Sequence, residues 1–508
     1  MQAAFDVIVI GSGIGGLTSA ALLAKNGLRP LVLEAHFFPG GNAQTFRRKK
    51  MFDFDVGVHY LGDCGPDGTI PTVLNQIGIA DEIDWLPMDP DGFDTLIFPD
   101  LRFRVPVGWD RYRERLHEAF PQETRAIDRY LEVMQQLSAG PMGPAPEQQA
   151  QVQRLVDKTW DQCTLGDVFD SLECSVRLRH VLAALNGTYA APPSRASAAV
   201  HALLTNHYLR GAYFPRGGGR SLVDALVRFI EGHGGEIRLR SRVQRILVEG
   251  GKAVGVELAK GGELRAPIVI SNADAKRTYL EMVGEKHLSP ELTQRVRESR
   301  MALPLFMVYL AMKVDPAELG LANSNYGLME YTLEEDYQAC YEGRIPEKPA
   351  VFISIASLKD PTSRNIAPEG YTNLQLITLA PAQPEAWGAE KSPGEGGRYR
   401  HTLDYTTVKK DLEERLLHHI EEKMPGLIRN VEWMESATPL TQERFTLSTG
   451  GTSYGLEHSP DQFRDKRFAM QTEIPGLYLA GANTIFGHGI AGAMVSGAAV
   501  AGAVLAAR

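Results

Sequence analysis

The sequence predicts an α/β protein whose first domain contains a parallel sheet, and three segments indicate this fold. Residues 5–35 read as an apolar strand, a glycine turn, an Ala- and Leu-rich helix and a second strand, which together make a βαβ unit. Residues 236–270 carry short strands separated by glycine turns, and residues 475–507 return to strand, glycine turn and helix. With 508 residues, of which 44% are hydrophobic, the chain can bury a large core and is long enough for two domains.

Residues 107–137 are expected to form two helices broken at Pro121. The second helix has one apolar face, formed by Ile127, Tyr130, Leu131, Met134 and Leu137. A loop rich in Pro and Gly is expected to follow at 138–149.

The middle of the chain predicts a helix over Ser221–Glu231 that ends in two glycines. Short strands are then expected at 236–240, 243–248, 252–258 and 267–270, and they read as a meander joined to the first domain. Residues 281–430 mix strands, such as "LPLFMVYLAM", with a helix at 407–423.

Composition excludes some classes of partner. The net charge of -9 provides no basic field, so nucleic acid is not expected to bind. The four cysteines lie far apart without a CxxC pair, so the sequence suggests neither a zinc site nor a disulfide framework, and no metal is expected. A reduced, cytoplasmic setting fits this cysteine usage best.

Two terminal segments bear on location. The chain enters an apolar strand at Phe5 without a basic start, so no secretory signal is expected. Residues 490–507 carry no charge and are just long enough to span a bilayer. Their Ala and Gly content favours instead a helix buried in the protein, and peripheral membrane contact stays open.

The first chemical motif is Gly11-x-Gly13-x-x-Gly16, with Glu34 at the end of the next strand. Glycines allow a tight turn and let the backbone approach a pyrophosphate at a helix N-terminus, where amides and the helix dipole favour negative charge. Glu34 would then accept hydrogen bonds from the hydroxyls of an adenosine ribose. The preceding strand, the following helix and the spacing of the acid make this a strong signal for a dinucleotide, without separating NAD from FAD.

Two further segments carry a resemblance to flavoproteins. "PGGNAQTF" at 39–46 resembles the second glycine pair of the amine oxidase and carotenoid desaturase superfamily, and "GLYLAGANTIFGHGIAGAMVSGA" at 476–498 resembles its C-terminal flavin segment. The resemblance implies FAD as cofactor. Besides the first motif, it implies cofactor contacts from Gly40, Gly41, Asn42, Val243, Gly481, Asn483, Gly489 and Ile490. A helix start near Ile490 would stabilise negative charge on the reduced flavin ring.

The resemblance also implies how the chain is divided. It covers both ends and the middle, so the fold class is α/β with a discontinuous Rossmann-type FAD-binding domain, like glutathione reductase and the two-dinucleotide-binding family, plus a second α+β substrate domain. The expected FAD-binding domain comprises 1–75, 215–280 and 431–508, and the substrate domain comprises 76–214 and 281–430. Only one strand-linked GxGxxG is present, so electrons are expected to pass to or from an external donor or acceptor.

The N-terminal third resembles the retinol saturase branch, through "LEAHFFPGG", "FDFDVGVHYLG", "LNQIGIADEIDWLPM" and "FPQETRAIDRYLEVM" in order. This implies an FAD-dependent oxidoreductase acting on a carbon–carbon double bond of a lipophilic isoprenoid or polyene, with hydride transfer at flavin N5. The alternatives are a redox-neutral cis–trans isomerase and a non-catalytic lipid-binding escort on the same fold. An apolar substrate fits peripheral membrane contact.

Saturation or desaturation needs a proton donor or acceptor beside the flavin. The candidates are His59 and Tyr60, in the loop after the glycine pair, and His488, just before the C-terminal helix. The competing interpretation is structural: His59 holds the loop through a carbonyl, Tyr60 is a core aromatic and His488 supports the cofactor from behind.

Overall fold

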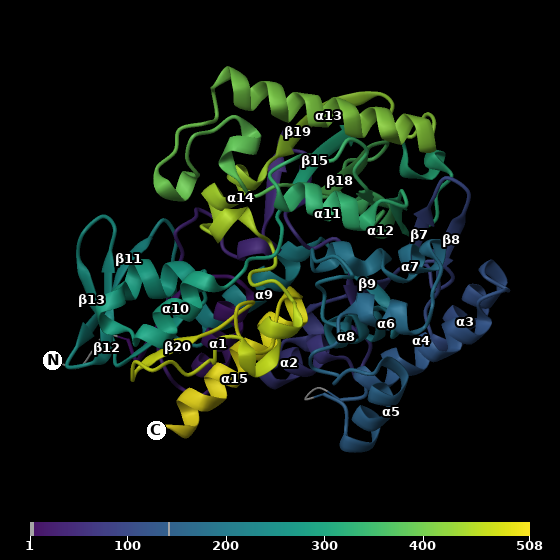
Figure 1. Cartoon of the computed structure of the whole chain (residues 1–508). Helices are drawn as coiled ribbons and strands as arrows, with labels where there is room; N and C mark the ends of the chain where they lie inside the picture. Colours follow the sequence, from purple (N-terminus) through teal and green to yellow (C-terminus); the bar gives the residue numbers. More distant parts are fainter. Residues whose placement is uncertain (1–4, 141–142) are drawn as a thin grey trace.

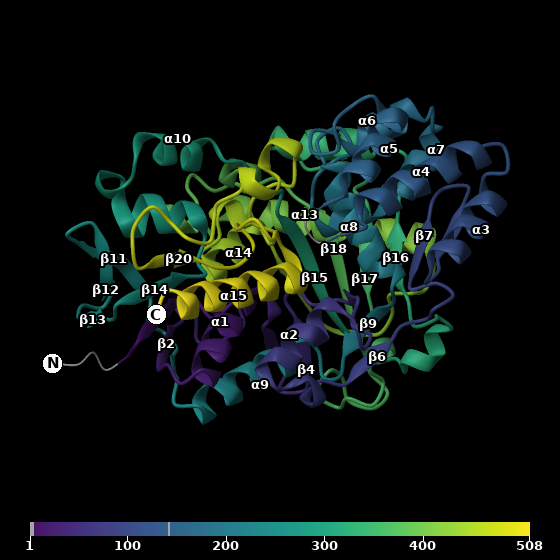
Figure 2. The same ribbon diagram turned by 90° about the horizontal axis from the view of Figure 1, so that it is seen from below.

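The structure is a computed structural model that describes residues 5–140 and 143–508. The first four residues of the predicted FAD-binding domain and residues 141–142 of the predicted loop lie outside the described residues. Figures 1 and 2 show the elements labelled along the chain.

A five-stranded parallel sheet forms the base of the first domain, in the order β10-β2-β1-β14-β20. Its strands are β1 (Val7–Ile10), β2 (Pro30–Leu33), β10 (Glu236–Arg238), β14 (Ile268–Ser271) and β20 (Leu477–Leu479). All four residues of β1 and of β2 are buried, as expected for a parallel sheet covered on both faces. Because the strands come from both ends and the middle of the chain, the Rossmann-type domain is discontinuous, as predicted.

Two helices from opposite ends of the chain lie side by side on this sheet, α1 (Ile14–Lys25) and α15 (Gly489–Ala506), in both views (Figures 1 and 2). A Cβ atom on Gly497 would lie 2.4 Å from the carbonyl oxygen of Gly15, so glycine permits this close approach. α2 (Thr69–Ile77) and α9 (Gly219–Gly232) also pack in this layer. α15 has the length and composition to cross a membrane. Only 33% of its residues are buried in the protein, so the prediction of a buried helix holds for one face of the helix.

The expected meander is smaller than predicted. Antiparallel pairing joins only β11 (Val243–Glu249), β12 (Lys252–Leu258) and β13 (Glu263–Arg265). The strands expected at 236–240 and 267–270 instead enter the parallel sheet as β10 and β14. Local turns predicted strands correctly here, but pairing partners far away in sequence decide which sheet a strand joins.

The second domain is built on a seven-stranded mixed sheet in the order β19-β15-β18-β17-β16-β7-β8. Its strands are β7 (Asp94–Ile97), β8 (Arg102–Val105), β15 (Leu305–Met312), β16 (Asn325–Leu328), β17 (Val351–Ser354), β18 (Thr372–Leu379) and β19 (Val431–Ala437). The long helix α13 (Leu403–Lys423) covers one face of this sheet (Figure 1). Since β19 pairs with β15, we propose that the domain boundary drawn at 431 lies after Ala437.

A helical layer completes the second domain. Its helices are α3 (Trp109–Ala119), α4 (Thr124–Leu137), α5 (Pro146–Val156), α6 (Leu165–Ser171), α7 (Val176–Leu182) and α8 (Ala198–Leu209). The two helices predicted over 107–137 are confirmed, and the whole predicted apolar face of α4 is buried. α5 begins at Pro146, inside the loop predicted at 138–149, because proline suits the first turn of a helix.

Further short elements complete the described fold. They are the hairpin β3 (Thr45–Arg48) and β4 (Phe52–Asp55), the small sheet of β5 (Leu61–Gly62), β6 (Trp85–Pro87) and β9 (Ala212–Pro215), and the helices α10 (Pro290–Glu298), α11 (Leu333–Tyr341), α12 (Ala356–Lys359) and α14 (Pro439–Thr446). The segment with His59 and Tyr60 lies between β4 and β5, so it runs from one domain toward the other.

Candidate active site

One large cavity, of about 2110 Å³, connects the two sheets. Its lining includes Ile10 and Leu33, at the carboxyl ends of β1 and β2. It also includes Asp94 and Ile377 from the seven-stranded sheet. Ligands in open α/β sheets bind at the carboxyl ends of the strands, so the cavity lies where such a ligand belongs.

The first glycine motif forms one end of this cavity. Gly11 has a φ of +88°, and Gly13 caps α1 at the cavity wall. A Cβ atom on Gly16 would lie 2.3 Å from the carbonyl oxygen of Gly11, so the third glycine lets the helix pack on the strand. The first turn of α1 contains no acidic residue, which leaves the positive end of the helix dipole available to a phosphate.

Glu34 lies just beyond β2 on the cavity wall, together with Val243. Its carboxylate accepts hydrogen bonds from the backbone N–H of Ser12 at 2.9 Å, from the Ser12 hydroxyl at 2.5 Å and from the backbone N–H of His36 at 2.7 Å. A carboxylate has about four acceptor positions, so one position remains for a ribose hydroxyl.

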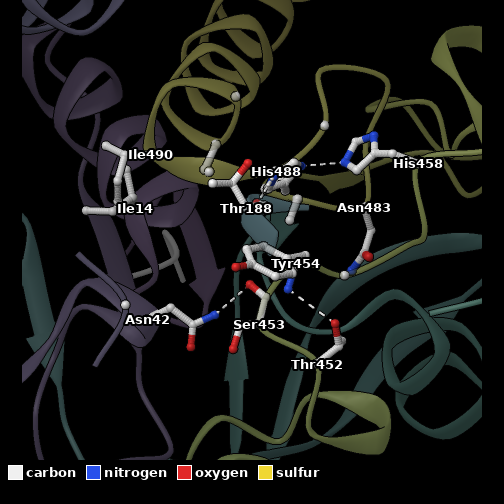
Figure 3. Close-up of a pocket in the computed structure, with 18 of the residues that line it drawn as sticks. Ile14, Asn42, Thr188, Thr452, Ser453, Tyr454, His458, Asn483, His488 and Ile490 are labelled. Carbon is white, nitrogen blue, oxygen red and sulfur yellow. Dashed lines mark hydrogen bonds between the residues drawn. The ribbon is translucent and has the colours of Figure 1, made fainter. Parts of the chain in front are cut away.

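The second glycine pair lies against the first motif. The amide of Gly40 donates to the carbonyl of Ser12 at 3.1 Å, and Gly41 has a φ of +57° that places its backbone against Gly13. Asn42 connects this turn to the C-terminal segment, because its Nδ2 donates to the carbonyl of Ser453 at 3.0 Å (Figure 3).

The C-terminal segment closes the other side of the cavity. Gly481 has a φ of +91°, and Gly489 begins α15, whose Ile490 lies beside Ile14 on the cavity wall (Figure 3). The Oδ1 atom of Asn483 accepts from the backbone N–H of Leu456 at 3.0 Å.

Asn272 is a cavity residue that the sequence analysis did not single out. A Cβ atom added to Gly13 or to Gly481 would lie 2.6 or 2.5 Å from its side-chain amide. The asparagine therefore fills the space between the glycine turns at the two ends of the chain. Asn272 directly follows β14, and nothing local in the sequence marks this asparagine as the one between the turns.

His59 and Tyr60 form part of the wall on the side of the seven-stranded sheet. Tyr60 is buried, stacks on Tyr208 with ring centroids 4.4 Å apart, and donates from its hydroxyl to Asp94 at 2.9 Å. Burial, together with the nearby charge of Lys359, lowers the pKa of His59 to about 3, so the imidazole is neutral near pH 7. Burial raises the pKa of Asp94 to about 6.

His488 lines the cavity on the side of the first domain, directly before α15, and both of its ring nitrogens are used within the protein. Nε2 donates to the carbonyl of Thr188 at 2.9 Å, and Nδ1 lies 2.5 Å from Nε2 of His458 (Figure 3). Because a carbonyl only accepts, Nδ1 of a neutral His488 is the acceptor and His458 donates. Burial lowers the pKa of His488 to about 4, which keeps this ring neutral.

These features together define a class of protein. A parallel sheet with a glycine turn, an acid after the second strand, a second glycine pair and a helix start from the far end of the chain form the cradle of a two-dinucleotide-fold flavoprotein. The backbone conformations of Gly11 and Gly481 and the free helix start of α1 fit FAD, which is the cofactor.

Comparisons with known proteins place the chain within this class. Residues 14–374 match the family of flavin containing amine oxidoreductases, and the chain belongs to that family. The all-trans-retinol 13,14-reductase of Rattus norvegicus is 33% identical over 519 residues, which cover 96% of this chain and 84% of that protein. A chloroplastic prolycopene isomerase of Daucus carota is 27% identical over 96% of this chain and 77% of that protein.

A solved structure of putrescine oxidase with putrescine bound shares the fold, with a TM-score of 0.67 at 15% identity over 99% of both chains. The predicted fold class, the FAD cofactor and the retinol saturase and carotenoid desaturase branch are confirmed. The chain is an FAD-dependent oxidoreductase that acts on carbon–carbon bonds.

Proposed function

We propose that the enzyme saturates one carbon–carbon double bond of a lipophilic polyene alcohol. The observation that carries this proposal is the cavity of about 2110 Å³, which is larger than a typical small-molecule site and continues past the cofactor cradle between apolar side chains. These side chains include Leu137, Val200, Leu203, Leu204, Met329, Leu333 and Phe352. A polyene has few polar groups, so an apolar wall supplies its binding energy.

Bound FAD supplies hydride chemistry at N5. The chain itself has to hold the polyene at a fixed place, exclude water and provide one proton. The similar protein of Rattus norvegicus is an all-trans-retinol 13,14-reductase, and a relative that is a reductase supports saturation as the direction of the reaction.

Product mass tests the proposal. The purified holoprotein is reduced without oxygen, mixed with all-trans-retinol, and the extract is analysed by mass spectrometry. Saturation adds two hydrogens to the product. An isomer of unchanged mass would support the isomerase alternative, to which the carrot relative gives weaker support.

We propose that the glycine residues, Glu34, Asn42, Val243, Asn483 and Ile490 hold FAD as the sequence analysis expects. Glu34→Ala should lower the flavin content of the purified protein at least about tenfold, because one charged hydrogen-bond acceptor contributes about 1.5–3 kcal/mol. The matched control is Glu263→Ala, on the exposed strand β13, which should keep the parent ratio of flavin to protein absorbance. Equal flavin content in both variants would contradict the ribose role of Glu34.

We infer that electrons come from an external donor. The supporting observation is that, over residues 5–140 and 143–508, a single fully parallel sheet is present, with one glycine turn at its first helix. NADPH added alone should therefore leave the flavin oxidised, whereas dithionite should bleach it. Rapid bleaching by NADPH would contradict the inference.

We infer a cytoplasmic enzyme with peripheral membrane contact, because a polyene substrate partitions into lipid. The purified protein should sediment with phosphatidylcholine vesicles loaded with retinol. Full recovery in the supernatant would contradict the membrane contact.

A further inference from the structure

A buried chain of polar side chains runs from the cavity wall into the seven-stranded sheet. The Tyr60 hydroxyl donates to Oδ2 of Asp94 at 2.9 Å, and Nδ2 of Asn325 donates to Oδ1 of the same carboxyl group at 2.8 Å. Nζ of Lys359 in turn donates to Oδ1 of Asn325 at 2.5 Å. The chain therefore links a cavity residue, Tyr60, to a buried amine through three hydrogen bonds.

The sheet fixes this arrangement. Asp94 is the first residue of β7 and Asn325 is the first residue of β16, and the two residues are paired in parallel register. Lys359 ends the short helix α12, and its ammonium group also donates to the carbonyl of His59 and to Oγ of Ser354, both at 2.7 Å. All three hydrogens of the ammonium group are thus used inside the protein.

This arrangement is costly for a purely structural role. Lys359 is 2% exposed and Asp94 is 6% exposed, and a neutral amide separates them, so neither charge meets its partner directly. Isolated buried charges cost several kcal/mol, and titratable groups with strongly shifted pKa values concentrate at functional sites. Burial lowers the pKa of Lys359 to about 7 and raises that of Asp94 to about 6, so both groups titrate near neutral pH.

We propose that Tyr60 donates the proton of saturation and that Asp94, held by Asn325 and Lys359, supplies that proton to Tyr60. This inference rests on the proposed function. Tyr60 and Asp94 both line the cavity, whereas His488 has no free ring nitrogen and His59 is held neutral. Asn325 and Lys359 are positioning residues, because they act through Asp94.

The step balances as follows. The reduced flavin, when bound, would supply a hydride to one carbon of the double bond, and Tyr60 gives its phenolic proton to the other carbon. Before the step Asp94 takes up a proton, so that its carboxyl group donates to the Tyr60 oxygen and the phenolic proton turns toward the substrate. The Tyr60 oxygen takes this carboxyl proton as it gives up its own, so the tyrosine ends neutral and the carboxylate carries the charge. The Lys359 ammonium stabilises that carboxylate through Asn325, and water later returns one proton to Asp94.

The titratable groups that surround Asp94 come from several elements. Tyr60 and His59 approach from the loop after β4, and Lys359 approaches from α12. Tyr208 of α8 stacks on Tyr60, and Asp55 of β4 influences Lys359. The titration of Asp94 therefore reports on this whole cluster.

Single-turnover reduction of retinol by the photoreduced holoenzyme tests the donor. Tyr60→Phe should slow product formation about a hundredfold and Asp94→Asn at least about tenfold. The control is Tyr130→Phe, which also removes a buried tyrosine hydroxyl but lies outside the cavity lining, bonded to His201. It should react at the parent rate with the parent flavin content.

A solvent isotope experiment separates donation from packing. In D₂O the parent should incorporate one deuterium into the product and show a slowed turnover. Tyr60→Phe should lose this solvent effect on the remaining slow rate, because proton transfer then follows another route. A Tyr60→Phe variant with the parent rate and the parent isotope effect would overturn the proposal.

An infrared titration of the oxidised holoenzyme gives a readout without turnover. A component of the protonated carboxyl band should titrate near pH 6, and subtracting the Asp94→Asn spectrum from the parent spectrum separates it from Asp55 and Asp336, whose pKa values are raised to about 7 and about 6. In Lys359→Met this component should persist to a pH about one unit higher, because the ammonium charge favours the carboxylate. A parent without such a band would overturn the proposal. If the parent shows the band but forms no product two hydrogens heavier, the proposed function fails and this proton-carrying pair still stands.

Discussion

The two sides of the cavity carry similar residues that are held in different ways. On one side Tyr60 meets a buried carboxyl group, Asp94, whose pKa lies near neutrality. On the other side His488 meets a second histidine and a backbone carbonyl, and both of its nitrogens are engaged. Both nitrogens of His488 are thus occupied within the protein, whereas the proposed donor Tyr60 has a carboxyl partner with which it can exchange a proton.

The comparison shows that the partner decides the role of a side chain. In the sequence, His59, His488 and Tyr60 are equally good candidates for the proton donor, since each lies near glycines in a segment that resembles flavoproteins. Of these three side chains, that of Tyr60 hydrogen-bonds to a carboxyl group whose pKa is raised to about 6, whereas His59 contacts Lys359 only through its backbone carbonyl.

The largest effect is expected for a substitution of Lys359, the buried end of the hydrogen-bonded series that begins at Tyr60. Lys359→Met should lower the free energy of unfolding by about 3 kcal/mol or more, because three buried acceptors lose their donor and Asp94 loses its compensating charge. Urea denaturation measures this change. The control is Lys410→Met, at an exposed pair with Glu414, which should change stability by less than about 0.5 kcal/mol. If both substitutions lowered the free energy of unfolding equally, the buried hydrogen bonds of Lys359 would contribute no more to stability than an exposed ion pair.

A smaller effect is expected on the opposite side. His488→Ala should lower the free energy of unfolding by about 1–2 kcal/mol, because His458 and the carbonyl of Thr188 lose their partners. The same variant should bind FAD more weakly while its bound flavin keeps the parent solvent isotope effect on retinol reduction. If His488→Ala abolishes that isotope effect, the distinction between the two sides is wrong.

The smallest effect concerns the charge of His59. Its pKa in the folded state is about 3, below the ordinary 6.5, so the unfolded chain binds the extra proton and stability falls as the pH falls below 6.5. Between pH 6.5 and 5.5 this loss amounts to about 1 kcal/mol, and His59→Gln should remove it. Urea midpoints at the two pH values measure the difference. A variant with the parent pH dependence would show that His59 is charged in the folded protein.

Part of the site could be predicted because its signals are local. Gly11, Gly13, Gly16 and Glu34 follow one strand–turn–helix–strand pattern, and the sheet places them as that pattern requires. The second glycine pair and the start of α15 were found through resemblance to flavoproteins, and they line the same cavity.

The missed residues have no local signal. Asp94 and Asn325 meet because two strands pair across more than two hundred positions, and Lys359 reaches them from a four-residue helix. His458 was missed for the same reason, since its partner lies thirty positions further along. The strands β10 and β14 were likewise assigned to the meander, because their partners in the parallel sheet, β2 and β1, lie more than two hundred residues away in the sequence.

The close packing of α15 on α1 has a consequence for the order of assembly. The first strand and helix leave the ribosome early, yet β20 and α15, which complete the cradle through Gly481 and Gly489, are translated more than four hundred residues later. The early half of the cradle must therefore wait while the whole second domain is synthesised and folds. FAD is then expected to bind only after synthesis of the chain has reached α15, so the first domain is completed later than the second.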